Sequence, residues 1–230
     1  MAQQDEYPVG DTSHLPGRIP IFPLTGVLLL PGAKLPLNIF EPRYLEMVRD
    51  GMAGDRLIGM VQPIDPDSRQ RRPGIYGVGG AGRITAYEET DDGRILITLT
   101  GVSRFRVAEE LDVTTGYRQV VADWETFAAD RAADAGDGTI DRPRLLMALQ
   151  AYLTMIKIPA DWKAIEQAPS GPLVDNLAMI CPFAPSEKQA LLEAPDVLER
   201  SRVMTALIEM AVLQHAGGHD SDEDERPNVH

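Results

Sequence analysis

Residues 77–84 read GVGGAGRI, and Gly77, Gly79 and Gly82 have the G-x-G-x-x-G spacing of a dinucleotide-binding turn. Such a turn follows a strand and opens a helix, whose first N–H groups bind the pyrophosphate. Here the next residues are Arg-Ile-Thr-Ala-Tyr, which favour a strand, and the stretch about 20 residues further on, GVSRF, holds no carboxylate. We therefore predict that these glycines permit a close backbone approach or a β-bulge, and that the chain uses no nucleotide cofactor.

Other residue types that carry chemistry lack a productive arrangement. His215 and His219 have helical i, i+4 spacing, but two glycines lie between them and the glutamate of H-E-x-x-H is missing, so we predict no metal site. The adjacent acids Glu88 and Glu89 point to opposite faces of a strand and cannot act on one bond. Cys181 lies in the apolar stretch NLAMICPF and is predicted to be buried. We expect no catalytic residue.

The stretch LPLNIFEPRYLEMV combines aromatic and charged residues at the start of a predicted helix. Pro42 suits the first helical turn, where its missing N–H needs no partner, and a carboxylate at Glu41 favours that helix end. The pattern predicts a structural junction at Glu41, Pro42 and Arg43, in which aromatic residues pin a helix to a sheet. The alternative is a groove that admits an extended peptide. Its candidate residues are Phe40, Tyr44 and Met47.

The elements that position these residues change along the chain. Residues 18–126 contain many short apolar runs cut by prolines, one helix after Pro42 and a hairpin signal at Asp92-Gly93, which together predict a small β-barrel. Residues 142–217 carry helical periodicity and predict a helical bundle. We expect residues 1–17 to form a disordered leader, 127–141 a linker and 218–230 a disordered acidic tail. The predicted fold class is α+β.

Composition restricts the partners. The net charge is −13, which repels phosphate backbones and anionic lipid surfaces, so we expect neither a nucleic acid nor a membrane partner. The one basic cluster, Arg69, Arg71 and Arg72, favours a solvated loop over a binding stripe. No apolar run approaches the roughly 20 residues that span a bilayer, and residues 1–17 lack signal-peptide features. We expect a cytoplasmic location.

The stretch IPIFPLTGVLLLPGAKLPLNIFEPRYLEMV resembles the opening of the N-terminal substrate-binding domain of the Lon family of ATP-dependent proteases. IGMVQP, YGVGGAGRI, ILITLTGVSRFRV and the helical EKQALLE continue the resemblance over residues 18–215. It implies a PUA-like pseudo-barrel followed by a helical bundle. In that fold, the glycines of residues 77–82 match a strand.

The resemblance implies a bacterial, stand-alone protein that binds polypeptides and lacks the ATPase and Ser–Lys protease domains of full-length Lon. We therefore expect a non-enzymatic module that binds polypeptide segments or unfolded proteins and assists a protease as an adaptor in quality control. Two alternatives stay open. One is RNA binding, by analogy with PUA-like barrels, which the net charge opposes. The other is a small-molecule enzyme, which a cavity lined by convergent polar groups would favour.

Overall fold

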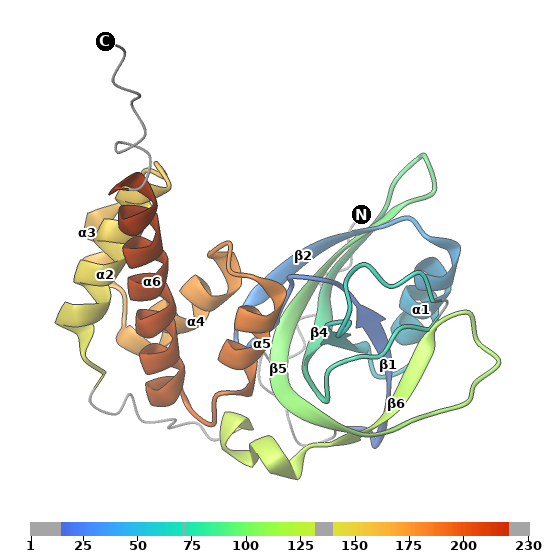
Figure 1. Cartoon of the computed structure of the whole chain (residues 1–230). Helices are drawn as coiled ribbons and strands as arrows, with labels where there is room; N and C mark the ends of the chain where they lie inside the picture. The colour runs from blue at the N-terminus through green and yellow to red at the C-terminus, as the bar shows by residue number, and fades with distance from the viewer. Residues whose placement is uncertain (1–14, 71, 132–139, 221–230) are drawn as a thin grey trace. The chain divides into compact units, whose positions relative to one another are not determined.

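The computed structural model describes residues 15–70, 72–131 and 140–220, with side chains described as far as residue 215 (Figure 1). Within these ranges the chain divides into two compact units. The first contains residues 15–131 and 179–193, and the second contains residues 140–178 and 194–220. Most of the predicted leader, linker and tail lies outside the described residues.

The first unit contains a six-stranded sheet and one helix near its N-terminal end. The elements are β1 (Arg18–Pro23), β2 (Lys34–Ile39), α1 (Pro42–Ala53), β3 (Leu57–Val61), β4 (Val78–Glu89), β5 (Ile95–Glu110), β6 (Arg118–Asp123), the 3-10 helix η1 (Glu125–Arg131) and α5 (Pro185–Glu193). α5 belongs to this unit, although it lies within residues 142–217 of the chain.

The sheet closes on itself. Its strand order is β2-β5-β4-β3-β1-β6, and β5 also pairs with β6. The long strand β5 makes this possible, because residues 95–100 pair with β2 and residues 106–110 pair with β6. Register shifts at Ala81/Gly82 and Val107/Glu109 supply bends of the kind that closure of a small barrel needs. The α+β prediction, with a closed sheet and C-terminal helices, is confirmed.

The side chains of the strands pack into two hydrophobic clusters, one on each face of the sheet. Ile19 and Ile21 of β1 lie in one cluster with Phe105, whereas Phe22 lies in the other with Met47 of α1. Successive side chains of a strand point to opposite faces, which explains this division.

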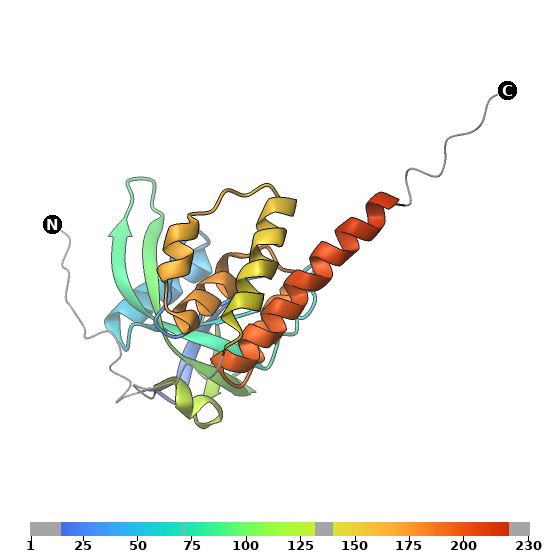
Figure 2. The same cartoon turned by 90° about the vertical axis from the view of Figure 1, so that its left-hand side faces the viewer.

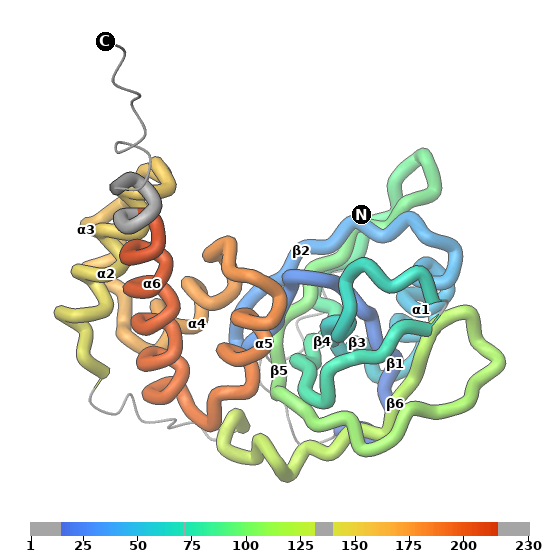
Figure 3. The backbone as a smooth tube through the Cα atoms, in the orientation of Figure 1, coloured from blue at the N-terminus to red at the C-terminus, as the bar shows by residue number. Residues whose placement is uncertain are grey.

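The apolar run GVLLLP is one of the proline-cut runs of the predicted barrel, and residues 27–30 are irregular backbone. Figure 3 traces the path of the chain from β1 to β2, which contains this run. Gly26 and Gly32 have φ of 72° and 77° and turn the chain on either side of the run. Its backbone then crosses β4 and β5 where those strands carry Gly80 and Gly101. A Cβ on Gly80 would lie 1.9 Å from the Leu29 carbonyl oxygen, so the crossing requires the glycine.

A buried ion pair joins β5 to η1 in the first unit. Arg104 is 1% exposed, and its Nε and Nη2 donate to the Asp130 carboxylate at 2.8 and 2.7 Å. Its Nη1 donates to the carbonyl oxygen of Leu192 in α5 at 2.9 Å. Directly after β3, Gln62 donates to the side-chain oxygen of Gln189 in α5 at 3.0 Å. These bonds hold α5 and η1 on the sheet.

The second unit consists of helices (Figure 2). These are α2 (Arg142–Met155), α3 (Trp162–Gln167), α4 (Ser170–Ile180, of which residues 170–178 fall in this unit) and α6 (Val197–Asp220). Asp141 and Asp161 cap α2 and α3 by accepting backbone N–H bonds at 3.2 and 3.1 Å. An ion pair of 2.6 Å between Arg200 and Asp175 joins α6 to α4.

Candidate functional site

The start of α1 is pinned to β1 through aromatic and cationic contacts. Pro42 is the first helical residue, as the sequence predicts, while Glu41 at the N-cap makes no side-chain bond to the helix backbone. The Glu41 carboxylate accepts bonds from Arg43 instead, at 3.1 and 2.8 Å. The Arg43 guanidinium lies 4.5 Å from the centroid of the Tyr44 ring, and that ring lies 4.2 Å from the ring of Phe22.

The structure separates the three residues of the predicted peptide patch. Phe40 is 64% exposed, whereas Tyr44 is 6% exposed and Met47 is fully buried. The helix turns residues 44, 47 and 48 toward the core, because positions three and four apart share one face. Met47 therefore cannot form part of an exposed patch, and Tyr44 can take part only through the edge of its side chain that reaches a cavity.

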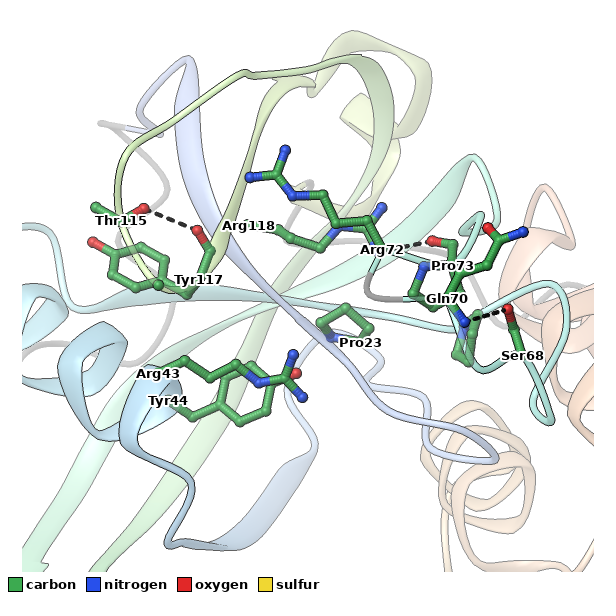
Figure 4. A pocket seen from close by; sticks show the side chains of 12 residues that line it. Pro23, Arg43, Tyr44, Ser68, Gln70, Arg72, Pro73, Thr115, Tyr117 and Arg118 are labelled. Carbon is green, nitrogen blue, oxygen red and sulfur yellow. Dashed lines mark hydrogen bonds between the residues drawn. The ribbon is translucent and has the colours of Figure 1, made fainter.

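That cavity has a volume of about 480 Å³ and lies in the first unit (Figure 4). Ligand sites typically enclose roughly 300–1,000 Å³. Four chain segments meet there: the end of β1, the start of α1, the connection between β3 and β4, and the β5–β6 loop with the start of β6. The lining residues are Pro23, Arg43, Tyr44, Pro63, Ser68, Gln70, Arg72, Pro73, Thr115, Gly116, Tyr117 and Arg118.

The β5–β6 loop is held against α1 beside the cavity. The Tyr117 hydroxyl donates to the Asp50 carboxylate at 2.8 Å, and the Thr115 hydroxyl donates to the Tyr117 carbonyl oxygen at 2.9 Å. Burial, followed by the bond to Asp50, raises the pKa of Tyr117 to about 12. The phenol thus keeps its proton and remains a donor at neutral pH.

Arg118 fixes the opposite wall. Its Nε and Nη2 donate to the Glu110 carboxylate at 2.8 and 2.6 Å, and its Nη1 donates to the Pro73 carbonyl oxygen at 2.9 Å. This bond to Pro73 ties the β3–β4 connection to β6. The hydrogen bond from Arg118 lowers the pKa of Glu110, so the pair stays ionised.

The Tyr44 hydroxyl has a different environment. The ring is packed between Phe22 and Arg43, and no hydrogen bond from its hydroxyl to another described residue is found. No buried side-chain oxygen of the described residues lacks a partner, so the Tyr44 oxygen is open to solvent. That oxygen is not sealed in the core, because Tyr44 lines the cavity. Burial raises the pKa of Tyr44, which keeps the phenol protonated. A buried ring therefore offers a free O–H donor to the cavity.

Sequence reasoning singled out Tyr44 and the arginine cluster but missed Thr115, Tyr117 and Arg118. No motif links residues 44 and 117. Their segments meet because β6 pairs with β1, and Phe22 of β1 packs against the Tyr44 ring. For the basic cluster of the β3–β4 connection, the sequence favours a solvated loop over a binding stripe. Its Arg72 lines the cavity, Arg69 does not, and Arg71 lies outside the described residues.

The glycine-rich stretch lies away from the cavity lining and belongs to β4. After Gly82 the chain continues as strand to Glu89 and forms a hairpin with β5. Cβ atoms on Gly79 and Gly82 would meet Phe105 at 2.6 Å and Leu29 at 2.5 Å, whereas one on Gly77 would meet nothing within 4 Å. Gly79 and Gly82 thus serve the close packing that the sequence predicts, whereas Gly77 precedes β4 and has open space around it, so the prediction is wrong for Gly77.

The sequence also makes predictions about a metal site, a membrane-spanning helix and Cys181. Among the described residues, no group of three or more His, Cys, Asp or Glu side chains could hold a metal ion. Within the same ranges, none of the helices combines the length and apolar character needed to cross a bilayer. Cys181 is buried, as predicted, and burial raises the pKa of its thiol to about 11.

Comparison with known proteins matches the chain to one family. The model for the ATP-dependent protease La (LON) substrate-binding domain matches residues 18–209. The Lon protease of Dictyoglomus thermophilum is 26% identical over 217 residues, which cover 92% of this chain and 27% of that protein. Lon protease 2 of Sorangium cellulosum is 28% identical over 199 residues, covering 83% and 24% respectively. The chain thus spans about a quarter of the length of these relatives.

Two solved structures share the fold. A Lon N-terminal domain protein from Xanthomonas campestris superposes with a TM-score of 0.59 at 24% identity, over 82% of this chain and 97% of that one. The N-terminal domain of Mycobacterium avium complex Lon protease gives a TM-score of 0.58 at 16% identity, over 83% and 97%.

Proposed function

The chain belongs to the family of the ATP-dependent protease La (LON) substrate-binding domain, and on this premise we propose that it is a polypeptide-binding module. Its ligands in this proposal are segments of unfolded or partly unfolded proteins. Family membership over residues 18–209 is the observation that carries the proposal. We extend it to an adaptor role in cytoplasmic protein quality control, in which the bound client is passed to a protease.

We place the binding site at the cavity between α1, the β3–β4 connection and the β5–β6 loop. It is lined by three prolines, two tyrosines and several polar groups, a mixture that suits contact with both the side chains and the amide groups of an extended segment. Its walls are held by the bonds of Tyr117 and Arg118, so the cavity is preformed.

The lining favours binding over catalysis. Its titratable side chains are three arginines and two tyrosines. Arginine does not lose its proton in proteins, and the pKa values of Tyr44 and Tyr117 are both raised. These groups hold their protons at neutral pH, which suits recognition of a ligand better than acid–base chemistry.

The test is binding of a permanently unfolded protein, prepared by reducing a small disulfide-bonded protein and blocking its cysteines with iodoacetamide. We expect saturable binding, measured by fluorescence anisotropy of the labelled protein. Thr115→Trp places a large ring on the cavity wall and should weaken binding about tenfold or more. Thr114→Trp is the matched control, since Thr114 is the exposed neighbour that does not line the cavity, and it should bind like the wild type.

The outcomes separate function from location. Absence of binding by the wild-type chain would refute the polypeptide-binding function. Equal binding by both tryptophan variants would leave that function intact and show that the site lies elsewhere.

A further inference from the structure

The charge of the cavity lining is opposite to that of the protein. The chain has 35 Asp and Glu against 22 Lys and Arg, yet the charged side chains that line the cavity are all arginines. They are Arg43, Arg72 and Arg118. The carboxylates of Glu41 and Glu110 contact two of them but are not part of the lining.

Two of the three arginines hold their carboxylate partners loosely. The side chains of Arg43 and Glu41 are 46% and 44% exposed, and water and salt screen such a pair, so Arg43 can exchange Glu41 for another anion. Arg72 Nη1 lies 3.7 Å from Asp112 Oδ1, beyond hydrogen-bond range, and the Asp112 side chain is fully exposed. The guanidinium of Arg72 therefore keeps most of its capacity to donate.

Arg118 has a different role. Its bonds to Glu110 and to the Pro73 carbonyl oxygen use all three of its guanidinium nitrogens, at 2.6 to 2.9 Å. Its side chain is 11% exposed, so this pair is better shielded than that of Arg43. We treat Arg118 as a positioning residue that holds the wall and the β3–β4 connection.

The Tyr44 hydroxyl gives independent evidence about the chemistry of the ligand. The residue is 6% exposed and lines the cavity, and no hydrogen bond from its hydroxyl to another described residue is found. No buried side-chain oxygen of these residues lacks a partner, so the hydroxyl oxygen is accessible from the cavity. The protonated phenol and the neighbouring guanidinium groups can all donate hydrogen bonds. They are therefore suited to bind the oxygens of an anion, which accept hydrogen bonds. Ser68, Gln70 and Thr115 can add neutral hydrogen bonds around it.

Building on the proposed function, we propose that this cavity recognises a carboxylate carried by the bound polypeptide. Arg43, Arg72 and the Tyr44 hydroxyl hold the carboxylate oxygens, while the prolines contact the neighbouring apolar atoms of the segment. The carboxylate belongs to an Asp or Glu side chain or to the C-terminal residue. This selects acidic segments or chain ends from the unfolded proteins that the family membership implies.

The experiment compares three labelled peptides of one apolar-rich sequence. The first has two central Glu residues and an amidated C-terminus, the second has Gln at both positions and the same amide, and the third has Gln with a free C-terminal carboxyl group. We expect the first or the third to bind about tenfold more tightly than the second, with an affinity that falls as salt rises. The peptide that binds more tightly identifies the source of the carboxylate.

Matched variants locate the effect. Arg72→Glu should weaken binding of the preferred acidic peptide at least tenfold and leave the uncharged peptide unchanged. Arg69→Glu makes the same charge change on an exposed residue of the same connection that does not line the cavity, and it should have little effect. Tyr44→Phe should weaken the preferred peptide several-fold without loss of folded structure by circular dichroism.

Each result supports or overturns the inference. Equal binding of all three peptides, or equal effects of Arg72→Glu and Arg69→Glu, overturns carboxylate recognition while polypeptide binding stands. If the unfolded protein binds but none of the peptides does, carboxylate recognition is refuted and polypeptide binding still stands. If the unfolded protein also fails to bind, the proposed function falls as well.

Discussion

Residues 28–31 cross the sheet at Gly80, and we predict that a side chain at this position destabilises the fold. A Cβ at this position would lie 1.9 Å from the carbonyl oxygen of Leu29, whereas contacts of real Cβ atoms essentially never fall below 3.0 Å. The two backbones must therefore part by about 1 Å in Gly80→Ala. Leu29 is 1% exposed and belongs to the core cluster, so the crossing segment has no free space into which to move.

The size of the effect follows from overpacking. Adding atoms to a packed core costs about 1–3 kcal/mol and occasionally more. Because the clash is with buried backbone rather than with the end of a side chain, we expect Gly80→Ala to lower the free energy of unfolding by about 3 kcal/mol or more. Gly77→Ala is the matched control. Its new Cβ meets nothing within 4 Å, and the change should stay within about 0.5 kcal/mol of the wild type or stabilise slightly.

The assay is urea unfolding followed by tryptophan fluorescence in a Trp162→Phe background, where Trp124 alone reports on the first unit. Trp124 packs against Phe105 with ring centroids 5.6 Å apart, so loss of the core changes its emission. The two variants also distinguish a dinucleotide-binding turn from close strand packing as the reason for the glycines. Gly77 is the first glycine of the dinucleotide pattern, whereas Gly80 is not one of its glycines, so only close packing makes Gly80 the more sensitive position. A Gly80→Ala variant that is no less stable than Gly77→Ala would show that the crossing does not need a glycine at position 80.

Three further predictions rest on single groups. Tyr117→Phe removes a hydrogen bond to α1 and should lower the free energy of unfolding by about 1 kcal/mol. Tyr44→Phe removes a hydroxyl for which no bond to a described residue is found, and should change it by no more than about 0.5 kcal/mol. Equal losses of the two variants in urea unfolding would contradict this. Asp130→Ala leaves Arg104 buried without its carboxylate and should cost about 3–5 kcal/mol; a loss below about 1 kcal/mol would show that the pair is dispensable. Because the thiol pKa of Cys181 is raised to about 11, little thiolate is present at pH 8, and alkylation by iodoacetamide should be far slower in the folded chain than in urea. Comparable rates, measured by mass spectrometry, would count against a buried thiol.

Much of the fold follows from local patterns. Pro42 marks the first residue of α1, and Asp92-Gly93 marks the β4–β5 turn, in which Gly93 has a φ of 81°. Such signals depend on the backbone preferences of one or two residues, so they can be recognised without knowledge of the rest of the chain.

The run GVLLLP shows where local patterns fail. It is apolar because it is buried, but burial alone does not distinguish a paired strand from a segment that crosses a sheet. The outcome depends on Gly80 and Gly101, which lie about 50 and 70 residues further along the chain and leave room for the crossing. The bounds of α3 show the same limit, because its six residues are too few to show a helical period.

By itself, the sequence determined the α+β class, the strand character of the glycine-rich stretch, the position of α1 and the similarity to Lon substrate-binding domains. Each of these depends on neighbouring residues or on a continuous motif. Only the tertiary structure decided that Met47 is buried, that Tyr44 presents a hydroxyl to a cavity, and that Arg72 and Arg118 share that cavity with it. The physical reason is that β6 pairs with β1 and β5, which places the start of β6 beside segments more than 40 residues earlier in the chain, and no local preference encodes that contact.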